Sequence, residues 1–205
     1  MITLIDYNAG NLTSVRLALE AVGETADVTG DPDVVRRASR IIFPGVGAAR
    51  SAMDYLEQSG LREAVSEVVK TGVPFMGICL GMQILLDHSE EDDGTCTFGL
   101  IPGEVKKFTP NDSAIKVPEI GWNNVKIERP HPIFDGVFDE DEFYFVHSYY
   151  PVPLNPEHWI GSTQYASVSF ASVIGRDNLI ATQFHPEKSG KIGLRMIENF
   201  IKWNP

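Results

Sequence analysis

Two hydrophobic patterns alternate along the first half of the chain. Short apolar runs, of the kind that forms buried strands, cover residues 2–6, 40–43 and 73–78. Apolar side chains at helical spacing cover residues 12–23 and 61–72, and each of these segments ends at a glycine, a common helix stop signal. Short strands that alternate with helices of about 10 to 15 residues are typical of βαβ units. We therefore predict an α/β fold with a mostly parallel sheet and flanking helices.

The pattern changes after about Gly94. A helical pattern still covers residues 189–203, but before it strand-like segments follow one another with only Pro, Gly and Asp turns between them. These segments cover residues 103–108, 123–128, 142–152, 166–175 and 179–185. Direct connections between strands predict antiparallel additions to the sheet in the C-terminal half. Because no repeat, low-complexity tract or linker divides the sequence, we expect a single domain over residues 1–205.

Composition narrows the functions that this fold can have. The 205 residues carry a formal net charge of −11, which argues against nucleic acid or anionic membranes as the main partner, because both select basic surfaces. No apolar run approaches the roughly 20 residues that a membrane span needs, and the first residues lack the basic region and apolar core of a signal peptide. Two cysteines, Cys79 and Cys96, are too few for a disulfide framework. We expect a cytoplasmic protein with reduced thiols.

Cys79 lies in the most informative motif of the sequence, GICLG. Gly77 and Gly81 flank it at the spacing of a nucleophile elbow, after a buried strand and before a helical pattern. Such a turn is strained and brings backbone segments close together, which favours glycine. We expect the positive end of the following helix to favour the thiolate, and the backbone N–H groups there to bind an oxyanion. Burial in the core is the other fate of a lone cysteine, and the two glycines make it the weaker interpretation.

A nucleophilic cysteine requires a base, and the five histidines are candidates. His185 follows the last strand-like segment and precedes Pro186, which favours an extended backbone. Residues two apart share one side of an extended chain, so His185 and Glu187 can point into the same site, where the carboxylate can orient the imidazole. His147 ends another strand and can either face a site or pack, while the other three lie in loops or turns. A metal site is a weak interpretation of His-x-Glu, since no third ligand is near.

A second glycine motif, PGVGAAR, follows the apolar run at residues 40–43. From Gly45 to Arg50 it matches a dinucleotide-binding fingerprint without the third glycine, so a nucleotide site is a weak prediction. A loop whose N–H groups complete an oxyanion hole fits better beside the elbow, and an ordinary tight turn stays open as well. Val46 is β-branched and resists the positive φ that would turn its peptide around. We therefore expect an N–H that points away at rest, in a loop that its two glycines leave free to switch.

The motifs GICLGMQ and QFHPEKSG give the chain a resemblance to the class I (triad) glutamine amidotransferases. DYNAGN, PGVGA, KVPEIGWN and FVHSYY occur in the order typical of one branch, the glutaminase subunits of imidazole glycerol phosphate synthase, and this resemblance covers nearly the whole chain. It implies a flavodoxin-like fold and hydrolysis of L-glutamine to glutamate and ammonia, without a metal or organic cofactor. It also implies a heterodimer with a (β/α)8 cyclase subunit, which uses the ammonia in histidine biosynthesis.

The resemblance also implies roles for individual residues. Cys79 is the expected nucleophile, which forms a γ-glutamyl thioester, His185 is the expected general base and acid, and Glu187 is its orienting carboxylate. The expected contacts to the oxyanion and to the rest of the substrate are Val46, Gly47, Leu80, Gln83, Glu91, Ser148 and Tyr149. The expected interface residues are Asn11, which is also a candidate helix N-cap, Trp122 and Lys188.

Two residues depart from the pattern of this branch. Asn8 stands where glycine is usual, and asparagine tolerates left-handed geometry. Glu119 stands where histidine or glutamine is expected, which affects the local detail of the interface loop and not the chemistry. Three other functions stay open: the glutaminase of another class I amidotransferase, such as the anthranilate synthase or pyridoxal phosphate synthase type, a thiol redox sensor, and a non-catalytic binding domain. PGVG and GWN count against the first, and glutamine turnover that depends on Cys79 would exclude the other two.

Overall fold

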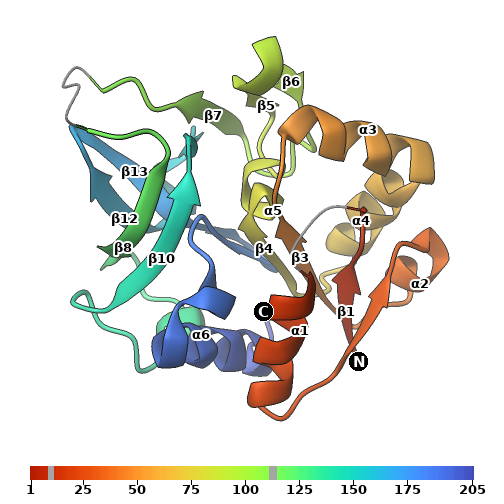
Figure 1. The fold of residues 1–205 in the computed structure, drawn as a ribbon. Coiled ribbons are helices and arrows are strands. Elements are labelled where there is room, and N and C mark those ends of the chain that lie inside the picture. The colour runs from red at the N-terminus through yellow and green to blue at the C-terminus, as the bar shows by residue number, and fades with distance from the viewer. Residues whose placement is uncertain (9–11, 111–114) are drawn as a thin grey trace.

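The computed structural model describes residues 1–8, 12–110 and 115–205. Within these residues, a central sheet carries helices on both faces (Figure 1). Its eight strands lie in the order β2-β1-β3-β4-β14-β13-β12-β9. In chain order the strands are β1 (Ile2–Ile5), β2 (Ala26–Thr29), β3 (Arg40–Gly45), β4 (Phe75–Cys79), β9 (Lys126–Ile127), β12 (Trp159–Tyr165), β13 (Val168–Arg176) and β14 (Leu179–Thr182).

Five strands of this sheet are parallel and three are antiparallel additions. The parallel part, β2-β1-β3-β4-β14, has the 2-1-3-4-5 order of flavodoxin-like folds. β13, β12 and β9 each run antiparallel to their neighbours. The predicted fold class is therefore confirmed. In such sheets ligands bind beyond the carboxyl ends of the parallel strands, and here β3 and β4 end together, with Gly45 opposite Cys79.

Helices cover the two faces of the sheet (Figure 1). A separate apolar cluster lies on each face. The α-helices are α1 (Leu12–Ala21), α2 (Pro32–Arg36), α3 (Ala49–Ser59), α4 (Leu61–Lys70), α5 (Leu80–Gln83) and α6 (Gly190–Lys202), and the 3-10 helices are η1 (Glu91–Asp93), η2 (Pro132–Phe134), η3 (Pro156–His158) and η4 (Pro186–Lys188). α1 and α6 pack on one face and α2 to α5 on the other. Leu4 joins the first cluster and Ile5 the second, as the alternation of strand side chains requires. None of the described helices has the length and apolar character needed to span a membrane.

Two smaller sheets lie beside the central one. β8 (Glu119–Asn124) and β10 (Glu142–His147) form an antiparallel ribbon. The other sheet contains β11 (Tyr149–Pro153), β7 (Gly103–Lys107), β5 (His88–Ser89) and β6 (Thr95–Cys96). The prediction of single strands over residues 123–128 and 142–152 is therefore wrong. Each segment supplies two short strands that belong to different sheets, and the second one breaks at Ser148, beside the candidate site.

Candidate active site

Cys79 lies in a strained turn at the carboxyl end of β4. Its φ of 55° falls in the left-handed region, which non-glycine residues rarely adopt. A Cβ added to Gly77 would come within 2.5 Å of the Gly81 carbonyl oxygen, and a Cβ added to Gly81 would collide with the Phe43 carbonyl oxygen. Both positions therefore require glycine. Strand, strained residue and flanking glycines together have the geometry of a nucleophile elbow.

One expectation about this elbow is wrong. The sequence predicts that the helix after Cys79 favours the thiolate through its dipole, but α5 contains only four residues. A macrodipole requires a longer run of aligned peptide units. Local donors take its place, namely the first N–H groups of the turn, which have no partner within a helix, and side chains that reach the sulfur, such as Gln183.

His185 and Glu187 form a buried pair beside Cys79. His185 Nδ1 lies 2.8 Å from Glu187 Oε1, and each side chain is 3% exposed. Burial lowers the pKa of His185, but interactions with Cys79 and Glu187 outweigh it and raise that pKa to about 10. The other ring nitrogen, Nε2, is buried and makes no hydrogen bond of standard geometry within the described residues. One nitrogen is thus held by a carboxylate, while the other is available to exchange a proton.

A cavity of about 330 Å³ opens over Cys79 and His185. The structure brings all seven predicted oxyanion and substrate contacts to its wall: Val46, Gly47, Leu80, Gln83, Glu91, Ser148 and Tyr149. Pro118, Val146 and His147 complete the lining. The size of the cavity suits a small molecule.

Tyr7 holds the loop between β3 and α3 that the sequence predicts to bind an oxyanion. Its hydroxyl accepts a hydrogen bond from the Val46 N–H at 3.1 Å and donates one to the Val46 carbonyl oxygen at 3.3 Å. Burial raises the pKa of Tyr7, so the hydroxyl stays neutral and can do both. Val46 does not adopt a positive φ, whereas Gly47 has a φ of 100°. The Val46 N–H is thus occupied by Tyr7, a residue 39 positions earlier that sequence reasoning missed.

Glu91 supplies negative charge at another part of the cavity wall. Its Oε2 accepts a hydrogen bond from the N–H of Ala49, the first residue of α3, at 2.7 Å. Burial raises the pKa of Glu91, and this hydrogen bond offsets part of the increase. A partly buried carboxylate in this position is the type of group that an α-ammonium group requires.

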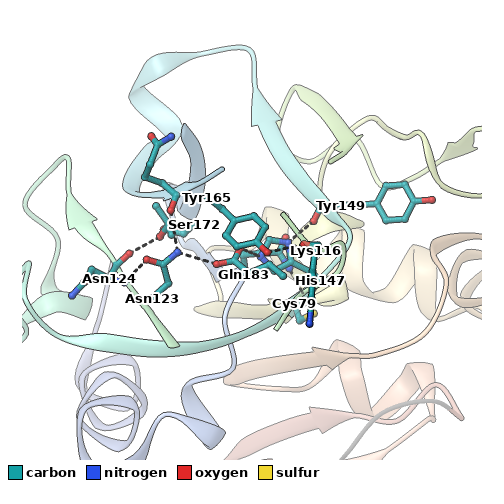
Figure 2. Close-up of polar contacts among 12 residues, drawn as sticks. Cys79, Lys116, Asn123, Asn124, His147, Tyr149, Tyr165, Ser172 and Gln183 are labelled. Atoms are coloured by element: carbon teal, nitrogen blue, oxygen red, sulfur yellow. Dashed lines mark hydrogen bonds and ion pairs between the residues drawn. The ribbon is translucent and has the colours of Figure 1, made fainter. Parts of the chain in front are cut away.

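Gln183 contacts the reacting sulfur, although it was not among the predicted site residues. Its Nε2 lies 3.6 Å from Cys79 Sγ, and the two side chains lie close together in Figure 2. Gln183 directly follows β14 and is fully buried. The alternation that places His185 and Glu187 on one side of the extended chain also places Gln183 there. The signal was therefore present in the sequence, two residues before His185.

Glu119 is the residue that stands where histidine or glutamine is expected, and the sequence predicts that it lies in the interface loop. This prediction is wrong, because Glu119 lies in the interior. Its Oε2 lies 3.1 Å from His147 Nε2, and the two side chains are 4% and 2% exposed. The two residues are cross-strand neighbours in β8 and β10. Asn123 donates a hydrogen bond to Glu119 Oε1, and His147 Nδ1 lies 2.8 Å from the Tyr149 carbonyl oxygen. This pair fastens the β8–β10 ribbon to the cavity wall.

The predicted interface residues lie in different places. Asn11 lies outside the described residues. Trp122 is 53% exposed on β8, and its ring centroid lies 6.0 Å from that of Tyr144. Lys188 Nζ lies 6.0 Å from the centroid of the same Tyr144 ring. Together with the exposed Ile120, these side chains form a surface that we name the Trp122 patch (Ile120, Trp122, Tyr144 and Lys188).

Known proteins are similar to this chain in fold and in sequence. Residues 3–203 match the family described as glutamine amidotransferase class-I. The structure of PurLQS from Thermotoga maritima is similar in fold, with a TM-score of 0.73 at 19% sequence identity, and the match covers 98% of this chain and 97% of that one. The chain belongs to the class-I glutamine amidotransferase family.

Two relatives within that family are similar to this chain over its full length. The imidazole glycerol phosphate synthase subunit HisH of Thiobacillus denitrificans is 44% identical over 213 residues, which cover 100% of this chain and 92% of that protein. The protein of the same name from Nitratidesulfovibrio vulgaris is 46% identical over 208 residues, covering 99% and 96%. The branch predicted from the motifs is therefore the branch in which these relatives fall.

Proposed function

We propose that this chain is the glutaminase subunit of an imidazole glycerol phosphate synthase, and that Cys79, His185 and Glu187 hydrolyse L-glutamine. One observation carries the proposal: a cysteine in a strained elbow lies beside a buried histidine whose Nδ1 is 2.8 Å from a carboxylate oxygen. Nucleophile, base and orienting acid are the parts of an acyl-transfer site. The relatives named HisH support the choice of synthase.

The first half of the reaction forms a thioester. His185 takes the thiol proton through Nε2, and the Cys79 sulfur attacks the side-chain amide carbon of glutamine. Glu187 stabilises the imidazolium that results. The N–H of Leu80 and an N–H of the loop at Val46 and Gly47 receive the tetrahedral oxyanion, where one donor is typically worth roughly 3–4 kcal/mol. The C–N bond then breaks, and His185 returns its proton to the departing ammonia.

The second half of the reaction releases glutamate. Neutral His185 takes a proton from water, which attacks the thioester carbon. The C–S bond breaks, and its electron pair returns to the Cys79 sulfur. Throughout both steps, Glu91 holds the α-ammonium group, and the backbone of Ser148 and Tyr149 holds the α-carboxylate. No step requires a metal ion or an organic cofactor.

The proposed partner is a (β/α)8 cyclase subunit that consumes the ammonia. The Trp122 patch is its docking surface, since an exposed aromatic side chain next to an exposed apolar one is typical of the core of an interface. Ile120 of this patch pairs across the ribbon with Val146, which lines the cavity, so the patch adjoins the glutamine site. Ammonia would be protonated in bulk water, and a dry path into a docked partner avoids this loss.

The test is ammonia release from glutamine in three samples: the chain alone, the chain with the cyclase subunit, and the pair with the nucleotide ligand of the cyclase. We expect the fastest release in the third sample. An absence of glutamine hydrolysis in the complete complex would contradict the proposal. Hydrolysis of glutamine without any response to the cyclase subunit would point to another class-I glutaminase.

A further inference from the structure

A row of buried side-chain amides connects the cavity wall to the reacting sulfur. Gln83 Nε2 donates to the Tyr149 carbonyl oxygen at 3.0 Å and to Gln183 Oε1 at 2.9 Å. Gln183 Nε2 donates in turn to Cys79 Sγ at 3.6 Å, a normal length for a hydrogen bond to the larger sulfur atom. Gln83 is 5% exposed and Gln183 is 0% exposed. Bulk water therefore does not compete for these bonds.

The backbone at Tyr149 fixes the direction of this row. A carbonyl oxygen can only accept, so the end of Gln83 that faces Tyr149 is its NH2 group. The same NH2 group faces Gln183, which must present its oxygen there. Because an amide carries one oxygen and one nitrogen, the end of Gln183 that faces Cys79 is its NH2 group. The sulfur therefore meets a donor and not an acceptor.

We propose that Gln183 is a further catalytic residue, which donates an N–H hydrogen bond to the Cys79 sulfur and stabilises it as a thiolate; this rests on the proposed glutaminase function. The donor acts at two points of the reaction. Before the attack it stabilises the anion that forms when His185 takes the thiol proton. During thioester hydrolysis it stabilises the thiolate that leaves as the C–S electron pair returns to sulfur. In the thioester between these steps the sulfur is uncharged. The hydrogen bond from Gln183 is therefore strongest in the two thiolate states, before the attack and during thioester hydrolysis.

The role of Gln183 differs from those of its neighbours in the site. A primary amide neither gives nor takes a proton near neutral pH, so Gln183 cannot replace His185. Gln83 acts through Gln183 and is a positioning residue, because it holds the Gln183 oxygen and leaves the nitrogen directed at the sulfur. Bound glutamine would meet Gln83 and Tyr149 on the cavity wall and Cys79 at its floor, with this row behind them.

The test compares Gln183→Met and Gln183→Glu with the wild-type chain in the complete synthase. Methionine keeps the approximate volume without the donor, and glutamate keeps the acceptor for Gln83 while it presents an oxygen to the sulfur. Loss of a hydrogen bond to a charged group corresponds to a fall of about 10- to 100-fold in kcat, with a larger fall expected for Gln183→Glu. The KM for glutamine should change by less than about twofold, since Gln183 is not among the residues that line the cavity. Gln164→Glu, the same change at an exposed position of β12, is the matched control.

Alkylation by iodoacetamide gives a second readout that does not depend on glutamine turnover. Mass spectrometry of the Cys79 peptide should give a rate at pH 7 that falls about tenfold or more in Gln183→Met, while the exposed Cys96 in the same sample reacts at the wild-type rate. Circular dichroism checks the fold of each variant. If the buried charge of Gln183→Glu prevents folding, Gln183→Met alone tests whether Gln183 stabilises the thiolate.

Two results would overturn the role of Gln183. One is wild-type alkylation of Cys79 in folded Gln183→Met, and the other is a raised KM at unchanged kcat. Glutamine turnover that survives loss of Cys79 would instead refute the proposed function, and the alkylation rates would still report the contact between Gln183 and the sulfur.

Discussion

Replacing one sulfur atom with oxygen separates chemistry from folding at the elbow. We predict that Cys79→Ser abolishes glutamine hydrolysis and leaves the fold intact, because serine has nearly the same shape but a far less acidic hydroxyl. Ammonia release and a thermal melt measure the two effects. Cys96→Ser is the matched control, since Cys96 is exposed in β6 and has no flanking elbow. Turnover above about a tenth of wild type in Cys79→Ser would exclude Cys79 as the nucleophile.

The raised pKa of His185 makes part of the folding stability depend on pH. Its ordinary value is 6.5 and its value in the folded chain is about 10. The stabilisation from the imidazolium is therefore complete below pH 6.5 and is lost as the pH rises through about 10. We predict that the wild-type chain loses stability relative to His185→Gln between pH 7 and pH 10, by at most about 1.4 kcal/mol per pH unit. Urea unfolding of both chains across this range measures the change. If the wild-type chain instead gains stability relative to His185→Gln as the pH rises, the predicted sign is wrong.

Single residues of the site were predictable where the backbone places them locally. His185 and Glu187 share one side of an extended segment, and the two glycines around Cys79 mark the elbow. Tyr7 could not be found in this way, because its contact with Val46 joins two loops that only the folded sheet brings together. Glu119 was misplaced for the same reason, since its partner His147 lies on another strand.

At the scale of elements, the β8–β10 ribbon depends on one buried pair. Glu119→Ala leaves the Asn123 amide and the buried His147 ring without their carboxylate neighbour. An unsatisfied buried polar group typically costs about 1–3 kcal/mol, and we predict a loss of that size in the free energy of unfolding of Glu119→Ala. Glu119→Gln should lose less, because an amide oxygen still accepts from Asn123. Glu142→Ala, at an exposed end of β10, is the control. Equal stability of Glu119→Ala and Glu142→Ala in urea unfolding would contradict the role of the pair.

The sequence predicts where many strands and helices lie, but it does not predict which sheet a strand belongs to. The apolar period of residues 142–152 is continuous, so it contains no sign that β10 pairs with β8 while β11 pairs with β7. Pairing partners far apart in the sequence decide the break at Ser148. The length of α5 could not be predicted from the sequence either. The periodic apolar residues after Cys79 suit a long helix, but the helix ends after a single turn and the chain continues to β5.

At the scale of the whole molecule, the contact between Tyr7 and the oxyanion loop bears on activity without a partner. We predict that the isolated chain hydrolyses glutamine slowly and that Tyr7→Phe accelerates it, because the Val46 N–H loses its acceptor and the loop can turn. One oxyanion donor is worth about 10²–10³-fold in rate, which is the upper limit of the gain. Steady-state ammonia release measures it, with Tyr55→Phe in α3 as control.

In the complete synthase the difference between Tyr7→Phe and wild type should nearly vanish. A partner can switch the loop only by binding its turned state more tightly than its resting state. Once the partner is bound, the loop is held in the turned state whether or not the Tyr7 hydroxyl is present. An isolated Tyr7→Phe chain that is no faster than wild type would mean that Tyr7 does not restrain the loop. Full activity of the isolated wild-type chain would exclude switching altogether and leave the triad unaffected.

Association with the cyclase subunit should depend on the Trp122 patch. We predict that Trp122→Ala raises the Kd of the complex roughly 10- to 30-fold, because aromatic anchors carry much of the binding energy of an interface. Phe138→Ala is the control, since Phe138 is also exposed but lies outside the patch. Calorimetric titration of each variant with the cyclase subunit gives the Kd. If Trp122→Ala and Phe138→Ala change the Kd equally, the Trp122 patch is not the interface.

The glycine contacts at the elbow limit how this enzyme can diversify. A Cβ at Gly45 would lie 2.7 Å from the Leu80 Cβ, and a Cβ at Gly81 would collide with the backbone of β3. The end of β3 and the turn after β4 therefore fit each other only when both positions are glycine. A chimera that takes one of them from a protein with a side chain at either glycine position would inherit a steric clash, whereas a cassette that spans β3 through α5 would carry both segments. Natural recombination and laboratory shuffling should thus preserve activity only at breakpoints outside that cassette.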